Sequence, residues 1–405
     1  MRATSVLGTS TRGPTQKAGL GGLFCSNEAA NPGFSNAHKL YIPYRSGDLH
    51  AGQRTTTYAD WGVFFSGHLH LVHIIDHLKQ RNSETNILNA AKVLLTGSSA
   101  GGIGTILNAE WFSASAFPNA VVKAAPVSGF FADLSDLNAT YPEFIAGDTH
   151  PIPLNMSAAA DVWDTHTPAS CVTAVGNGNP PALCFFAPVS VPLSPVDFLV
   201  IESQFDRNPL QSRLGFPTDF ARALETDEGR AYLRLYGDVN RAAHQRLDNV
   251  FSPSCFDHVS GFGVTSESST SVSVDGQTVS ANALIHDWFF EVNTMPRKIV
   301  EDRSASGLPG NPTCSSVDAQ TQPSRWRVPA CVRACLAGCG ASADMLAGSA
   351  ACACAAAACE TRRACSAADA AAVSAALSQL CASAPEQVQE QQERAGEGEE
   401  SSESG

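Results

Sequence analysis

A short apolar run, followed at once by six small residues and then by a helical pattern, limits the folds open to this chain. KVLLT at residues 92–96 predicts a fully buried strand, GSSAGG at 97–102 a tight turn, and the residues through Trp111 and Phe112 a helix. A helix that follows a strand so directly brings the chain back across the sheet to a parallel neighbour. The segment therefore predicts an α/β domain with parallel strands.

The turn also matches G-x-S-x-G, the pattern of a nucleophile elbow. In that arrangement a strained backbone lifts the Ser99 hydroxyl clear of the sheet, and Gly97, Gly101 and Gly102 let neighbouring chain segments pass close. The helix start that follows directs free N–H groups toward the same point, where they favour a developing oxyanion. A Gly- and Ser-rich turn without chemistry is the alternative, because G-x-S-x-G alone is common.

Strand and helix patterns alternate along the rest of the chain. Apolar runs predict further strands at residues 39–44, 121–127, 196–203 and 248–258, the last running into a loop. Helical spacing predicts helices at 68–80 and within 217–246. The first of these helices carries one apolar stripe, formed by Leu69, Val72, Ile75 and Leu78. The order of elements favours a doubly wound, mostly parallel sheet of the α/β-hydrolase type.

A serine nucleophile needs a base, and the base needs a carboxylate that orients it. In this fold the chain order is serine, acid, histidine. Asp206 follows the predicted strand 196–203, and His258 lies on the later loop SPSCFDH. The sequence therefore predicts Ser99 as nucleophile, Asp206 as orienting acid and His258 as general base. A solvated loop carboxylate and a surface histidine are the alternatives for the last two.

Four other residues compete for the roles of base and acid. His244 lies inside a helical pattern and His286 just before a Trp-Phe-Phe run, so neither offers the exposed loop that the base requires. Asp257 is adjacent to His258, and adjacent side chains rarely face each other productively. Glu202 is expected within the strand rather than beyond it.

Charge and hydropathy exclude several kinds of partner. The chain has 405 residues, 26 Lys and Arg against 39 Asp and Glu, and a formal net charge of −13. Phosphate contacts require Lys and Arg, so an acidic chain without basic clusters argues against binding to nucleic acid or to anionic lipid. No run approaches ~20 apolar residues, and no membrane-spanning helix is predicted.

Composition divides the chain after residue 314. Residues 1–314 are predicted to form a catalytic domain, and the Ser- and Pro-containing residues 315–330 a linker. Ala and Cys dominate 331–384, which predicts a helical segment pinned by disulfides; zinc binding is an alternative that no His or close Cys pair supports. The Glu- and Gln-rich residues 385–405 are predicted to be disordered.

Cysteine usage indicates an oxidising compartment. Five of the 13 Cys are spread over the first 320 residues and eight lie within 331–381, a distribution that fits disulfides in a secreted or cell-wall protein. Asn138 and Asn155 begin Asn-x-Ser/Thr triplets and are candidate glycosylation sites. The N-terminal residues contain no apolar signal core, so the chain is expected either to stay inside the cell or to lack its true start.

Six motifs resemble those of the pectin acetylesterase/Notum family and follow the family's order over residues 7–314. They are GSSAGG at 97–102, LCFF with a later FD at 183–206, SCFDH at 254–258, DG with a later DW at 275–288, NPTC at 311–314 and an N-terminal pattern over 31–52. The resemblance implies a serine carboxylesterase with Ser99, Asp206 and His258 as its triad and the Ala100 N–H in the oxyanion hole. Such an enzyme needs no metal or organic cofactor.

The resemblance has further consequences. It makes Cys171–Cys184 a plausible loop disulfide and leaves the partners of Cys255 and Cys314 open. Family members also carry a Gly-Gly-Gly-Trp loop that supplies a second oxyanion donor, and no such loop precedes Gly52. The expected explanation is an N-terminally truncated chain.

The predicted function is removal of O-acetyl groups from a cell-wall polysaccharide such as pectin. One alternative keeps the chemistry but removes a long fatty acyl group from a protein, as Notum does, because pocket volume cannot be read from the sequence. A second alternative is a truncated, catalytically impaired domain that serves as a binding module.

Overall fold

The computed structural model of the chain describes most of its first 314 residues. The described residues are 20–59, 62–132, 156–176, 181–212, 214, 216, 224–262, 264–265, 270–274, 276–292, 299–304 and 306–314. All of them belong to the first of two compact units, Met1–Pro323. The predictions for residues 315–405, and those for Asn138 and Asn155, lie outside the described residues.

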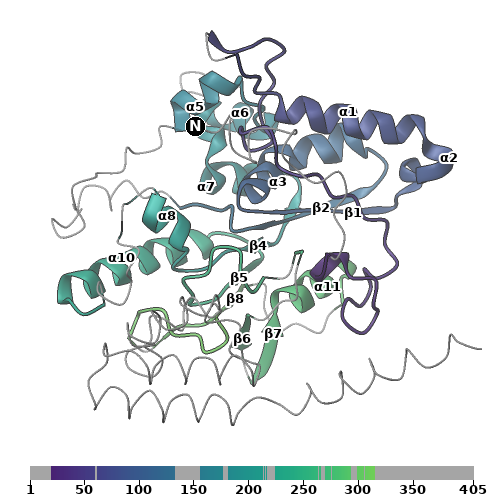
Figure 1. Cartoon of the computed structure of the whole chain (residues 1–405). Coiled ribbons are helices and arrows are strands. Elements are labelled where there is room, and N and C mark those ends of the chain that lie inside the picture. The colour runs from purple at the N-terminus through teal and green to yellow at the C-terminus, as the bar shows by residue number, and fades with distance from the viewer. Residues whose placement is uncertain are drawn as a thin grey trace, which may run out of the picture. The chain divides into compact units, whose positions relative to one another are not determined.

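Six strands form the central sheet, and every pairing within it is parallel (Figure 1). The order along the sheet is β1-β2-β4-β5-β8, with β3 also paired to β2. The strands are β1 Lys92–Ser98, β2 Val121–Val127, β3 Asp197–Phe198, β4 Val200–Ile201, β5 Val250–Ser252 and β8 Ile299–Glu301. The predicted α/β fold with a mostly parallel sheet is confirmed.

Helices α1 (Gly67–Gln80) and α3 (Ala100–Trp111) cover one face of the sheet (Figure 1). Ile106 of α3 shares a buried cluster with Val200 and Val250 of the neighbouring strands. Leu71 and Ile75 of α1 pack in a second cluster on the same side. Burial of aliphatic side chains of this kind is worth about 1.5–3 kcal/mol per residue.

Helix α11 (Ala281–Phe290) and a two-stranded antiparallel sheet cover the opposite face. The small sheet pairs β6 (Ser271–Val274) with β7 (Gln277–Ser280). Leu284 and Ile285 of α11 pack against Leu199 and Ile201, whose neighbours Phe198 and Val200 face the other side. The run 196–203 therefore presents apolar side chains to both faces of the sheet, because both faces are covered.

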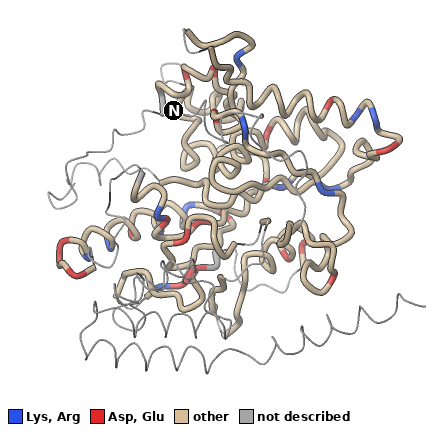
Figure 2. The backbone as a smooth tube through the Cα atoms, viewed as in Figure 1, with Lys and Arg blue, Asp and Glu red and all other residues tan. Residues whose placement is uncertain are grey.

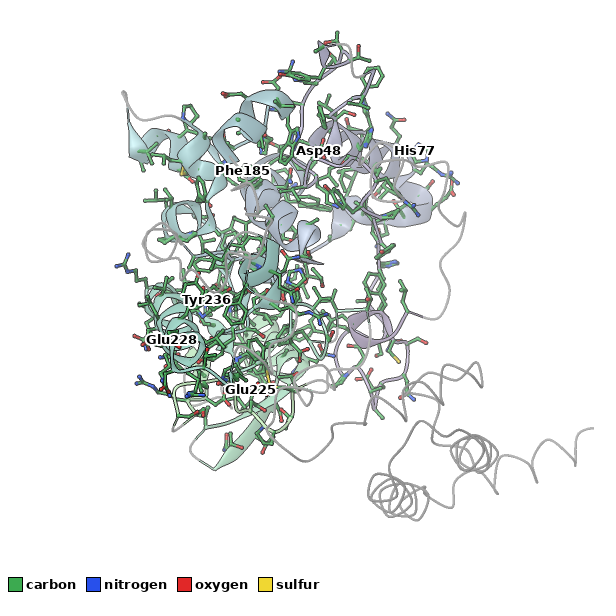
Figure 3. The ribbon with its side chains drawn as sticks, turned by 60° about the vertical axis from the view of Figure 1, so that its left-hand side comes forward. Asp48, His77, Phe185, Glu225, Glu228 and Tyr236 are labelled. Atoms are coloured by element: carbon green, nitrogen blue, oxygen red, sulfur yellow. A yellow bond between two sulfur atoms is a disulfide. The ribbon has the colours of Figure 1, made fainter. Side chains whose placement is uncertain are left out.

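Helix α10 (Asp227–His244) supports the carboxyl end of the sheet. The Thr226 hydroxyl accepts the Gly229 N–H at 3.0 Å and caps the helix. The apolar face of α10 includes Tyr236, labelled in Figure 3, and packs in one cluster with Phe205 and Phe256. Phe205 directly precedes Asp206, and Phe256 lies two residues before His258. The buried cluster therefore anchors the backbone next to both predicted site residues.

Shorter elements complete the described part. They are η2 Gly22–Phe24, α2 Asn82–Thr85, η4 Ile87–Asn89, η5 Phe112–Ala116, α5 Met156–Trp163, α6 Ala169–Val175, η6 Pro181–Phe185, α7 Ala187–Ser190, η7 Val191–Leu193 and α8 Arg207–Ser212. A disulfide between Cys171 of α6 and Cys184 of η6 joins two of them, in agreement with the resemblance.

Buried Asp48, labelled in Figure 3, explains the N-terminal motif. Its carboxylate accepts the Gly67 N–H at 2.7 Å and a hydrogen bond from the Ser46 hydroxyl. A Cβ on Gly52 or Gly67 would come within 2.4 or 2.3 Å of that carboxylate. The motif thus fixes the start of α1 against the loop that precedes it.

Three predictions about individual elements are wrong in detail. Residues 39–44 form no strand: Ile42 and Tyr44 pack inward while Leu40 and Tyr41 are exposed, so the alternation reports burial without a strand partner. Pro43 also lacks the N–H that a ladder needs.

The apolar stripe of α1 and the burial of β1 also differ from the predictions. The fully buried apolar side chains of α1 are Leu71 and Ile75, while Leu69 and Val72 are only half-buried. Strand β1 is half-buried rather than fully buried, because it lies at the end of the sheet order and pairs only with β2 among the described strands.

The described part of the chain bears on two expectations from composition, the lack of basic clusters and the lack of a membrane-spanning helix. Figure 2 shows Lys and Arg at separated points along the tube. Among the described helices, none combines the length and apolar character that crossing a bilayer demands.

Candidate active site

Ser99 occupies the single residue between β1 and α3. Its backbone is left-handed, with φ 57° and ψ −116°, a conformation that costs a non-glycine residue about 1–3 kcal/mol. Hydrogen bonds on both sides hold it there: Ser99 N–H donates to the Val127 carbonyl at 2.9 Å, and Ile103 N–H donates to the Ser99 carbonyl at 3.0 Å. Surrounding structure therefore fixes the strained turn that the sequence predicts.

Two of the three elbow glycines are required by close approach. A Cβ on Gly97 would lie 2.5 Å from the Gly101 carbonyl oxygen, and one on Gly102 would lie 2.6 Å from that of Val127. A Cβ on Gly101 would meet open space. The sequence could not separate these cases, because contacts across the turn and with the β2 end become visible only in three dimensions.

The structure brings Ser99, His258 and Asp206 into one hydrogen-bonded chain. The Ser99 hydroxyl lies 2.7 Å from His258 Nε2. His258 Nδ1 lies 2.7 and 2.9 Å from the two carboxylate oxygens of Asp206. With Nδ1–H donating to Asp206, Nε2 is left as the acceptor for the hydroxyl, which is the arrangement a serine nucleophile and its base require.

Asp206 is held in place from several directions. Its side chain is buried, and one carboxylate oxygen also accepts the Asn208 N–H at 2.7 Å. Its backbone carbonyl accepts the Tyr236 hydroxyl at 2.9 Å. The loop after β4 thus carries a fixed carboxylate, anchored to α10.

The loop that carries His258 is anchored by a disulfide between Cys255 and Cys314. Ser254 adds backbone hydrogen bonds: its carbonyl accepts the Gly310 N–H at 3.0 Å, and its N–H donates to the Asp302 carboxylate at 2.6 Å. The pairing that the sequence left open therefore ties the His258 loop to residues more than fifty positions later in the chain.

The competing histidines lie elsewhere. His244 is fully buried at the end of α10, with Nδ1 2.9 Å from the Ser252 hydroxyl. His286 lies on α11, with Nδ1 2.8 Å from the Asp287 carboxylate. Desolvation, reinforced by the nearby Arg241 charge, lowers the pKa of His244 to about 3, so that imidazole stays neutral at physiological pH.

Glu202 corrects a sequence prediction. It lies directly after β4, not within it, and its side chain is buried. Burial, followed by the charge of Asp206, raises the pKa of Glu202 well above its usual range. From the sequence alone, Glu202 is considered only as a competitor of Asp206 and is set aside, although its place at the end of the apolar run VDFLVIES is a signal that it could lie near the site.

The first turn of α3 is the available source of oxyanion donors. The opening N–H groups of a helix, beginning here with Ala100, have no intrahelical acceptor and lie at the positive end of the helix dipole. A cavity of about 360 Å³ adjoins the elbow. It is lined by Ser98, Val259, Ser260, Gly261, Val264 and Thr265, so its lining combines hydroxyl-bearing and apolar residues.

Comparison with known proteins shows two groups of relatives. Pectin acetylesterase 11 of Arabidopsis thaliana is 25% identical, over 75% of this chain and 76% of the relative. The palmitoleoyl-protein carboxylesterase Notum of Schmidtea mediterranea is 27% identical, over 59% of this chain but only 44% of that protein. This chain therefore spans less than half of the planarian relative.

A solved structure shares the fold. The Drosophila Wnt deacylase Notum superposes with a TM-score of 0.60 at 22% identity, over 76% of this chain and 83% of that one. The sequence model of the pectinacetylesterase family matches residues 1–315. With this match over most of its length, and with carboxylesterases among its relatives, the chain belongs to the pectinacetylesterase family and is a carboxylic ester hydrolase.

Proposed function

We propose that Ser99, His258 and Asp206 are the catalytic triad of this carboxylesterase, and that its substrate is an O-acetylated polysaccharide such as pectin. The observation that carries the triad is the unbroken hydrogen-bond chain from the Ser99 hydroxyl through both imidazole nitrogens of His258 to the Asp206 carboxylate. The three residues follow β1, β4 and β5, so they come from three different loops at the carboxyl edge of the sheet. A catalytic triad is likewise assembled from residues far apart in the chain.

The reaction follows from this geometry. His258 Nε2 takes the hydroxyl proton as Ser99 Oγ forms a bond to the ester carbonyl carbon. The carbonyl oxygen becomes an oxyanion, which the Ala100 N–H stabilises. When the C–O bond to the sugar breaks, His258 returns its proton to the leaving alcohol. Water, activated by the same imidazole, then releases acetate from Ser99.

Asp206 has an electrostatic and an orienting role in this scheme. It fixes the tautomer in which Nε2 is unprotonated, and it stabilises the imidazolium that forms in each step. Loss of such a carboxylate charge in a serine hydrolase lowers kcat by about 10⁴-fold.

An acetylated polysaccharide is supported by the relatives and by the cavity beside the elbow. The matched family and the Arabidopsis relative are named for pectin acetyl esters. Three of the residues that line the cavity, Ser98, Ser260 and Thr265, carry hydroxyl groups, a residue type that suits a polyhydroxylated substrate.

A Notum-like lipid deacylase acting on an acylated protein is the second candidate. It is supported by the fold shared with the Wnt deacylase and by Notum relatives among the sequence matches. A fatty acyl chain would need apolar walls, which Val259 and Val264 supply in part.

Two further proposals concern the protein as a whole. The disulfides at Cys171–Cys184 and Cys255–Cys314 support an extracellular or cell-wall location, because such bonds persist in oxidising compartments. The match over residues 1–315 supports a catalytic domain that ends near residue 314, followed by the linker, helical segment and tail expected from composition.

The test of the triad is hydrolysis of an aryl acetate by the full-length chain and its Ser99→Ala variant. We expect at least about a 10⁴-fold loss of kcat/KM. Ser273→Ala, at an exposed serine of β6, is the matched control and should keep full activity. Retained hydrolysis by Ser99→Ala, with a normal thermal melt, would overturn the assignment.

The substrate test compares acyl groups on the same alcohol. We expect acetyl esters to be turned over faster than octanoyl esters, and acetate to be released from acetylated pectin. Faster turnover of octanoyl esters, without acetate release from pectin, would favour the lipid deacylase instead.

A further inference from the structure

We propose that Glu202 is a positioning residue: a protonated carboxylic acid that donates a hydrogen bond to the Asp206 carboxylate and extends the triad to a fourth member. Its effect on catalysis rests on the function proposed above. Its protonation state does not, and can be tested separately.

Glu202 is enclosed by the ends of three strands. It follows β4 directly, is 2% exposed, and its backbone N–H donates to the Phe251 carbonyl of β5 at 3.0 Å. Its Oε2 accepts the Phe130 N–H, just past β2, at 2.9 Å. Its Oε1 is buried and receives no hydrogen bond from any N–H or hydroxyl of the described residues.

The contact between the two carboxyl groups fixes where a proton must be. A side-chain hydrogen bond with Asp206 is among the causes that raise the pKa of Glu202. Two carboxylates have only acceptor atoms, so such a bond requires one of them to carry a proton. Asp206 already accepts from His258 Nδ1 and from the Asn208 N–H, the pattern of an ionised group. The proton therefore belongs on Glu202 Oε1, the oxygen that no donor reaches.

The surroundings of Glu202 agree with a neutral acid. Asp206 is the titratable group that acts on it, while the described residues of the loop after β2 contribute the Phe130 N–H and β5 contributes a backbone carbonyl. Burial and the negative charge of Asp206 both raise the pKa of Glu202. A neutral acid satisfies one acceptor and one donor role at once, without adding a second buried charge beside the triad.

Glu202 also couples Asp206 to the loop after β2. Gly129, which precedes the Phe130 that donates to Glu202, packs so closely that a Cβ there would lie 2.5 Å from the carbonyl carbon of Gly102 in the elbow helix. Phe131, in the same loop, stacks on His258 with ring centroids 6.4 Å apart. Glu202 therefore links Asp206 to the loop that packs against the elbow helix and that carries the aromatic ring stacked on His258.

The first test uses Glu202→Gln. The amide keeps one acceptor and one donor and stays uncharged, so we expect little change in kcat/KM for an aryl acetate and no displacement of the acid limb of its pH profile. If Glu202 were ionised, removing its charge would move that limb to lower pH, because a negative charge near His258 favours the imidazolium. Such a displacement would overturn the proposal.

The second test measures the free energy of unfolding of wild type and Glu202→Gln against pH, and needs no activity. A carboxyl whose folded pKa is raised costs stability as pH rises above its unfolded value of about 4.5, because only the unfolded state ionises. We therefore expect the free energy of unfolding of the variant to rise relative to that of wild type as pH increases. Above pH 4.5 this difference should have the pH slope that the ionisation of one group produces. A difference that stays flat above pH 4.5 would show an ionised Glu202 and overturn the proposal.

The third test removes the donor. Glu202→Leu should lower kcat about 10- to 100-fold with KM little changed, because Asp206 loses its support. Unchanged kcat in a folded Glu202→Leu variant would exclude a positioning role. If that variant fails to fold, the first two measurements still decide the proposal. If Ser99→Ala remained active, the triad would fail while the stability measurement still reported on the Glu202 proton.

Discussion

The left-handed backbone at Ser99 depends on glycine at two neighbouring positions and not at a third. Gly97→Ala and Gly102→Ala should each destabilise the fold by about 1–3 kcal/mol and lower esterase activity at least tenfold, because the added methyl meets backbone atoms closer than 3 Å. Gly101→Ala is the matched control and should be neutral or slightly stabilising, since alanine favours a helix by up to about 1 kcal/mol. Urea unfolding and aryl acetate turnover measure both effects; equal losses in all three variants would contradict this account.

Individual residues of the site differ in how far the sequence alone predicts them. Ser99, Asp206 and His258 could be chosen as candidates because each stands at a recognisable break between an apolar run and a loop. Glu202 was not, because a glutamate at a strand end is indistinguishable from a solvated one until the strands around it are placed. The Ala100 N–H and the contact of Phe131 with His258 likewise depend on backbone positions rather than on residue type.

At the scale of elements, the two disulfides should have separable effects. Cys255–Cys314 closes a span of 59 residues and Cys171–Cys184 one of 13, so chain entropy predicts stabilisation of about 4 and about 3 kcal/mol respectively. Replacing Cys255 and Cys314 together by Ser should also lower kcat, because the His258 loop loses its anchor. The double Ser variant of the other pair, which joins α6 to η6, should lose stability but keep its kcat. Thermal melts and kinetics on folded protein check this; an unchanged kcat in the first variant would count against the anchoring role.

Helices and strands were predicted well where two signals agreed. The run 92–96 and the turn after it carried both periodicity and glycine pattern, and β1 and α3 follow them. Residues 39–44 carried alternation alone, and alternation reports which side chains are buried without reporting a strand partner. The half-buried state of β1 depends on its place at the end of the sheet order, which local sequence does not contain.

For the whole molecule, buried neutral histidines predict loss of stability in acid. Desolvation lowers the pKa of His244 to about 3 in the folded state, against 6.5 when exposed. Below pH 6.5 His244 is therefore protonated in the unfolded chain but not in the folded chain. The free energy of unfolding falls as pH falls from 6.5 toward 3. Between pH 7.5 and 5 this residue should contribute a loss of about 2 kcal/mol.

Urea unfolding of His244→Asn at the two pH values checks this contribution. The variant should lose about 2 kcal/mol less than wild type over that interval. His73→Asn, at an exposed position of α1, is the matched control and should follow wild type. An identical pH dependence in all three proteins would contradict the assignment of His244 as a buried neutral group.

The α/β architecture of the molecule was predictable because strands and helices alternate along most of the first 314 residues. The pairing of Cys255 with Cys314 and the packing of α10 beneath the site were not, since both join segments far apart in the sequence.

Covalent labelling tests the central claim most directly. A fluorophosphonate reacts with a serine only where a base activates the hydroxyl, so the full-length chain should be labelled on the peptide that contains Ser99, as located by mass spectrometry. Labelling should disappear in Ser99→Ala, fall strongly in His258→Ala, and remain in Ser273→Ala. Absence of labelling in folded wild-type protein, or a label on another serine, would contradict the proposed triad.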